Sequence, residues 1–241
     1  MATDVIRKLT SEPAVFFLIS LSLVLIVTLF NEELGTQIFK IYGALLILDL
    51  IIHLLFPNIE VKSVSGNTAT ALLYAGIAFA GLYILYGVVQ FMFRQSVLPV
   101  TATEQQLAQS VFQTVFQSFS TFSSQMVDFS KLTVVKYYLF GFLIPIQETR
   151  AIGRIYGAVA QIANVQIGNF RNIKNWSIII LVSILFMYFH LKVRGVNNNI
   201  DLAMTFLFAL VSLFIIGKFR EVESANYLHI GWNSFALFLG R

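Results

Sequence analysis

The chain has 241 residues, 57% of them hydrophobic and only 12% charged, with a mean hydropathy of +0.78. This composition excludes an ordinary soluble domain and is typical of an integral, multi-pass membrane protein in contact with lipid. The charge of +4 forms no basic stripe for nucleic acid, and the lack of cysteine excludes disulfides, thiol nucleophiles and cysteine-ligated metals.

Seven apolar stretches are long enough to suggest membrane helices in a single domain over residues 1–241. We interpret the first as a span and not as a signal peptide. It is longer than a usual signal-peptide core, and Asn31-Glu32-Glu33 follow it instead of a cleavage site. The expected spans are Ala14–Phe30, Ile38–Phe56, Ala71–Phe93, Leu132–Ile146, Trp176–His190, Leu202–Ile216 and Ala225–Gly240.

The segment Gln105–Val127, between the third and fourth spans, differs from the rest. It has no charged residue, and its apolar positions recur at alternating intervals of four and three. This period predicts an amphipathic helix, which is too polar to span a bilayer and suits the interface or a neighbouring helix. The expected fold class is therefore an all-α polytopic membrane helix bundle of about seven spans with an additional amphipathic helix.

Two spans carry polar pairs at a spacing that places both side chains on one helix face. Asp49 and His53 are four residues apart, and so are His229 and Asn233. Polar groups at membrane depth are costly, so they normally face a protein interior or a water-filled cavity. For Asp49 and His53 the favoured interpretation is a structural pair between helices. For His229 and Asn233, an interhelical hydrogen bond and a functional site are both open.

An acidic residue follows the fourth span, in the sequence Pro145-Ile-Gln-Glu148, with Arg150 and Arg154 close behind. Taken alone, these residues indicate an interfacial charge cluster that closes a membrane helix. However, two of the three histidines, His190 and His229, lie in later spans downstream of this acid. Glu148 could therefore belong to a site built from several helices.

In chain order the polar residues read Glu148, Phe186-x-x-x-His190 and His229-x-x-x-Asn233. This pattern resembles the CAAX-protease and bacteriocin-processing family of intramembrane endopeptidases, which includes the Ras-converting CAAX endopeptidases. The family's motifs are Glu-Glu-x-x-x-Arg, Phe-x-x-x-His and His-x-x-x-Asn on successive helices, and the second and third match here letter for letter. The resemblance covers roughly residues 140–240.

The first motif departs from the family pattern. Thr149 stands where the second Glu is expected, and Gly153 stands where the Arg is expected, with Arg154 one residue late. Arg150 is another candidate for the missing Arg. The resemblance thus implies a substrate-binding group made of Thr149, Arg150, Arg154 and Phe186.

The resemblance implies hydrolysis of a peptide bond in a membrane-anchored substrate, for example a prenylated one. Glu148, helped by His190, would activate water, and His229 and Asn233 would hold the oxyanion. Glu148, His190 and His229 also match the ligand types of a catalytic zinc. We expect no metal and no cofactor, because the motif helices offer few carboxylates to orient the imidazoles.

Two other functions compete with the protease. A catalytically silent relative that binds or scaffolds membrane partners is favoured by the altered first motif. A small transporter could use the buried polar residues as a relay, but the sequence shows no internal repeat of the kind that many transporters have.

Overall fold

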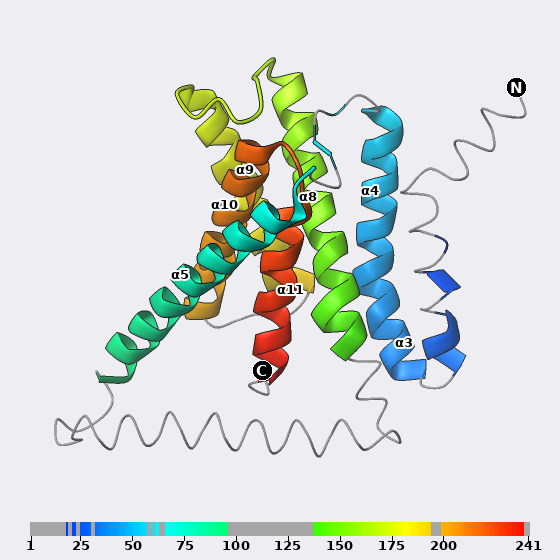
Figure 1. Cartoon of the computed structure of the whole chain (residues 1–241). Coiled ribbons are helices and arrows are strands. Elements are labelled where there is room, and N and C mark those ends of the chain that lie inside the picture. Colours follow the sequence, from blue (N-terminus) through cyan, green and yellow to red (C-terminus); the bar gives the residue numbers. More distant parts are fainter. Residues whose placement is uncertain are drawn as a thin grey trace, which may run out of the picture.

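The structure is a computed structural model that describes residues 18, 21–22, 25–29, 32–56, 59, 61–62, 66–95, 137–193 and 199–238. Every regular element in these residues is a helix (Figure 1), as the sequence predicts. The helices are α3 (Glu32–Ile38), η1 (Phe39–Gly43), α4 (Ala44–Leu55), α5 (Thr68–Gln95), η3 (Leu139–Leu143), α8 (Ile144–Ile162), α9 (Ile173–Val193), α10 (Asn199–Phe219) and α11 (Glu223–Phe238).

Three helices are long and apolar enough to cross a membrane. They are the Thr68–Val89 part of α5, the Ile173–Lys192 part of α9 and the whole of α10, and they match the third, fifth and sixth expected spans. Of the other described helices, α8 has 19 residues but carries Glu148, Arg150 and Arg154, and α11 has 16 residues, whereas a span needs about 20 predominantly apolar residues. The structure thus supports three of the seven expected spans.

Two expectations fall wholly or mainly outside the described residues. The amphipathic helix expected at Gln105–Val127 lies outside them entirely. Of the first expected span, only short helical pieces within residues 18–29 are described. The fourth expected span is described from Tyr137 onward, where it is helical and continues through η3 into α8.

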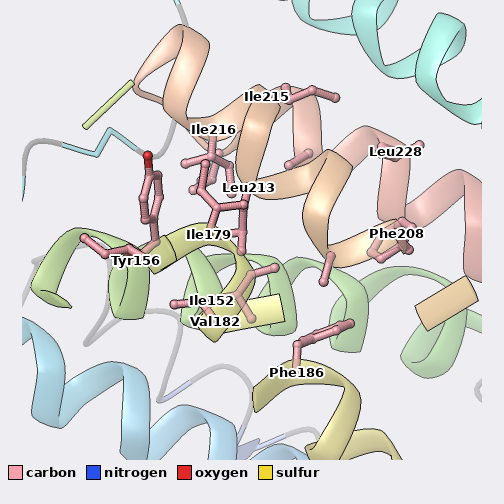
Figure 2. Packing of buried hydrophobic residues seen from close by; sticks show 14 of the residues in the cluster. Ile152, Tyr156, Ile179, Val182, Phe186, Phe208, Leu213, Ile215, Ile216 and Leu228 are labelled. Atoms are coloured by element: carbon pink, nitrogen blue, oxygen red, sulfur yellow. The ribbon is translucent and has the colours of Figure 1, made fainter. Parts of the chain in front are cut away.

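Helix α8 occupies the middle of the bundle, with α4 on one side and α9, α10 and α11 on the other (Figure 1). The main hydrophobic core joins α8, α9, α10 and α11 (Figure 2). It includes Ile152 and Tyr156 from α8, Phe186 from α9, Phe208 from α10 and Leu228 from α11. Helices with apolar residues all round are expected in such a buried or lipid-facing setting.

A proline near the start of α8 explains how α11 is fastened to this region. Pro145 has no backbone N–H and therefore donates no helical hydrogen bond. In an α-helix the acceptor would be the carbonyl of Gly141, four residues earlier. In the π-helical register of η3 it would be the carbonyl of Phe140, five residues earlier. The donors come from α11 instead. The Ser234 hydroxyl donates to the Gly141 carbonyl and the Asn233 amide donates to the Phe140 carbonyl, both at 3.2 Å.

The turn between α8 and α9 is fixed by a close backbone approach. Gly168 has a φ of +75°, and a Cβ at this position would lie 2.1 Å from the carbonyl oxygen of Gly217. The Tyr156 hydroxyl accepts a hydrogen bond from the Gly168 amide (3.3 Å) and donates one to the Asn175 side chain (2.6 Å). These contacts hold α8, α9 and α10 in register around the core.

Candidate functional site

Three polar side chains from three helices meet inside the bundle. Glu148 of α8 directs its Oε2 atom toward the Nε2 atoms of His229 on α11 and His190 on α9, at 3.3 and 3.8 Å. The exposed fractions of the three residues are 0% for Glu148, 2% for His229 and 5% for His190. Residues that are separated by as many as 81 positions in the chain thus form one buried cluster, which we call the Glu–His cluster.

Aromatic rings surround both imidazoles. The Phe186 ring lies 4.3 Å from the His190 ring and 6.0 Å from the His229 ring, measured between centroids. The Phe208 ring lies 4.6 Å from the His229 ring. Such rings give the two imidazoles apolar surroundings, in which electrostatic interactions are strong. Phe186, assigned to substrate binding from the motif, packs here against the two histidines.

The depth of the cluster follows from its neighbours. Phe208 is the tenth of the 21 residues of α10, so His229 lies level with the middle of a helix that can span a membrane. His190 lies in the last turn of the part of α9 that can span a membrane, Ile173–Lys192. A polar group at the depth of His229 is costly unless it has a partner, and here the polar groups of the Glu–His cluster face one another.

The hydrogen bonds of the two imidazoles determine where their protons are. The Nδ1 atom of His190 lies 3.0 Å from the backbone carbonyl of Phe186. A carbonyl only accepts, so Nδ1 must carry the proton and donate it. In the neutral form of this histidine, Nε2 is therefore unprotonated and turns a lone pair toward Glu148.

The same reasoning applies to His229 through Thr149. The Thr149 hydroxyl lies 2.8 Å from the Pro145 carbonyl and 2.9 Å from the Nδ1 atom of His229. Its single proton serves the carbonyl, since an oxygen–oxygen contact of 2.8 Å without a proton is repulsive. His229 must then donate its Nδ1 proton to the Thr149 oxygen. Its Nε2 also faces Glu148.

These assignments give the cluster a proton count. If both imidazoles were neutral with unprotonated Nε2 atoms and Glu148 were ionised, three hydrogen-bond acceptors would face one another without a proton between them. One additional proton makes the cluster neutral and turns the 3.3 Å contact between Glu148 and His229 into a hydrogen bond. The geometry therefore favours a cluster that holds one proton beyond those on the two Nδ1 atoms.

Asn233 lies one helical turn beyond His229, about 6 Å along α11. Its amide nitrogen donates to the Phe140 carbonyl, which belongs to η3 and not to the cluster. Because this nitrogen carries two protons, one of them can still serve another acceptor. The geometry thus gives Asn233 a structural hydrogen bond, and its role as an oxyanion donor stays a prediction.

The arginines of the first motif lie on α8 toward α4. The Nε atom of Arg154 pairs with Asp49 Oδ1 at 2.9 Å, so Asp49 links α4 to α8. Arg150 is buried. At Gly153, where the family pattern has Arg, a Cβ would lie 2.8 Å from a methyl group of Val222, so a long side chain does not fit there.

The sequence did not predict the structural roles of two residues in this region, Thr149 and Ser234. Thr149 was assigned to substrate binding from the altered motif, and the hydrogen bond of its hydroxyl to Nδ1 of His229 was not predicted. Ser234 was not singled out at all, although it supplies the donor that Pro145 lacks. A usable indication existed for Ser234, because a proline in a helix leaves earlier carbonyls in need of donors.

The donor types of the Glu–His cluster are those that zinc prefers. Within the described residues, no group of three or more His, Asp or Glu side chains is arranged to hold a metal ion. The two imidazoles are nevertheless oriented by other groups, a carbonyl for His190 and a hydroxyl for His229. Orientation of these rings therefore does not require the carboxylates that the sequence lacks.

Comparison with known proteins adds no relative. No family model matches the chain, and no curated protein or solved structure is significantly similar to it.

Proposed function

We propose that this chain is an integral, multi-pass membrane endopeptidase. It hydrolyses a peptide bond in a membrane-anchored substrate, such as a prenylated peptide, with a water activated by Glu148 and His190. The observation that carries the proposal is the convergence of Glu148 Oε2 with the Nε2 atoms of His229 and His190, at 3.3 and 3.8 Å, in a buried site. The order and spacing of the motifs support it further.

The proton count gives each side chain a role. The extra proton resides on Nε2 of His229 and leaves Glu148 ionised, so Glu148 is the base and the His229 imidazolium is a donor. The gap of 3.8 Å between Glu148 Oε2 and His190 Nε2 is too long for a direct hydrogen bond and suits a water that donates to both. This water is the nucleophile.

Hydrolysis then proceeds with balanced proton transfers. As the water oxygen attacks the scissile carbonyl carbon, Glu148 takes one of its protons. The resulting oxyanion accepts hydrogen bonds from the His229 imidazolium and from the second amide proton of Asn233. Glu148 then donates its proton to the leaving amine, and the carbon–nitrogen bond breaks. Charged partners in an apolar site make such stabilisation effective.

The experiment is cleavage of a lipid-anchored fluorogenic peptide library by the purified protein in proteoliposomes, with products identified by mass spectrometry. Glu148→Gln keeps the shape but removes the base, so turnover should fall by about 100-fold or more. The matched control is Glu33→Gln, an exposed carboxylate in the first turn of α3. Equal cleavage by the native protein and Glu148→Gln would refute the proposal.

A catalytically silent membrane protein that binds or scaffolds membrane partners is the second candidate. It is favoured by the altered first motif, since Gly153 has no room for Arg, and by the complete burial of Glu148. For that function, native protein and Glu148→Gln would bind the same partners and cleave nothing. The proteoliposome assay therefore separates the two candidates.

A further inference from the structure

The hydroxyl of Thr149 makes two hydrogen bonds, and the acceptor of the first determines which atom is the donor in the second. It is completely buried, and its hydroxyl lies between the Pro145 carbonyl of its own helix and Nδ1 of His229 on α11. The carbonyl can only accept, so the hydroxyl donates there and accepts from His229. The Nε2 atom of the same ring is directed toward Glu148, at 3.3 Å.

We propose that Thr149 is a positioning residue that keeps the Nδ1 atom of His229 protonated and thereby directs Nε2 to Glu148 as the carrier of the shared proton. This positioning role replaces the substrate-binding role that the motif resemblance implies for Thr149. Its kinetic consequence rests on the proposed endopeptidase function, whereas the protonation of His229 does not.

Removing the hydroxyl changes which nitrogen carries the proton. In Thr149→Val, which has nearly the same shape, Nδ1 of His229 would face a methyl group. A buried N–H without an acceptor is unfavourable, so the ring should become neutral with its proton on Nε2, donated to Glu148. The ring then keeps its Nε2–H but loses its positive charge, so the hydrogen bond that it can donate to the oxyanion is weaker.

The chain suits a direct measurement, because it contains only three histidines: His53, His190 and His229. Nitrogen-15 NMR of histidine-labelled protein in lipid distinguishes protonated from unprotonated ring nitrogens, and His190→Ala and His229→Ala assign the signals. We expect Nδ1 of His229 to be protonated in the native protein and in Thr149→Ser, and unprotonated in Thr149→Val.

Ser183→Ala is the matched control. Ser183 is also completely buried and donates to the carbonyl four residues earlier, that of Ile179, at 2.8 Å. Its loss should leave all histidine signals unchanged. An unprotonated Nδ1 in the native protein, or a protonated Nδ1 in Thr149→Val, would overturn the inference whether or not the protein cleaves peptides.

The kinetic readout is separate. Thr149→Val should lower kcat about 10- to 100-fold, the usual effect of losing a group that orients a functional histidine, with KM nearly unchanged, and Thr149→Ser should restore kcat. A larger change in KM than in kcat would instead assign Thr149 to substrate binding and overturn the positioning role. If the native protein cleaves nothing, the endopeptidase function fails, while the NMR result still decides the inference.

Discussion

Asn233 has one observed role and one predicted role, and a single substitution can measure both. The observed role is the hydrogen bond from its amide to the Phe140 carbonyl at 3.2 Å, which fastens α11 to η3. Interhelical hydrogen bonds in membrane proteins contribute about 0.6 kcal/mol on average. Asn233→Ala should therefore lower the unfolding temperature in detergent by only about 1–3 °C for a chain of this size.

The predicted role has a much larger effect on activity. If the second amide proton of Asn233 stabilises the oxyanion, Asn233→Ala slows turnover about 100-fold or more. A stability loss below 1 kcal/mol cannot account for this, since the protein remains almost entirely folded. The assay is the turnover of the lipid-anchored peptide at saturating substrate, together with the unfolding temperature of the same preparation.

Ser234→Ala is the matched control. Ser234 is the next residue on α11, and its hydroxyl donates to the neighbouring carbonyl, that of Gly141, also at 3.2 Å. It should cost about as much stability as Asn233→Ala, because it breaks the same kind of hydrogen bond, and leave turnover within about twofold. If both variants lose turnover equally, the effect is the attachment of α11, and the oxyanion role is wrong.

Three further predictions concern the cluster and the fold. His190→Ala should abolish hydrolysis but leave the protein folded, because the hydrogen bond of its Nδ1 atom lies within α9 and its Nε2 atom lies as far as 3.8 Å from Glu148; unfolded protein would contradict this. Gly168→Ala should destabilise the protein by about 3 kcal/mol or more, because its Cβ would collide with the Gly217 carbonyl at a positive φ. The control Gly76→Ala, on a helix with open space around it, should be neutral or slightly stabilising, and equal unfolding temperatures for the two variants would refute the clash. Elemental analysis of purified protein should find no tightly bound zinc, because one proton already balances the Glu–His cluster. About one zinc per chain, lost together with activity on chelation, would refute that expectation.

The sequence predicted helices well where length and apolar composition decide the structure. The parts of α5, α9 and α10 that can span a membrane overlap the expected Ala71–Phe93, Trp176–His190 and Leu202–Ile216. A helix is the structure that satisfies all backbone groups within one apolar segment, so composition alone is informative there. The expected boundaries were too short at both ends for α9 and α10, because hydropathy does not register polar terminal turns such as Ile173–Asn175.

The candidate site was harder to predict, because its decisive contacts join distant helices. The motif order indicated that Glu148, His190 and His229 belong together, and the three side chains do converge. The partner of Asp49 was not foreseen, since nothing in a single sequence shows that Arg154 reaches α4. The orientation of His229 by Thr149 depends on how α8 faces α11, and a spacing rule carries no such information.

The energetics of the bundle argue that the Glu–His cluster is not there for stability. Helix α11 is already held against this region by the hydrogen bonds from Asn233 and Ser234 to carbonyls of η3 and by its apolar contacts with α8 in the core. A buried ionisable cluster is commonly no more stabilising than apolar side chains of similar volume, and replacing it often raises stability by about 1–4 kcal/mol. Glu148 adds a carboxyl group that packing does not require, and the Nε2 atoms of two imidazoles face it. A local choice that works against stability is expected at a functional site, and a carboxylate that shares a proton with histidines is suited to acid–base chemistry.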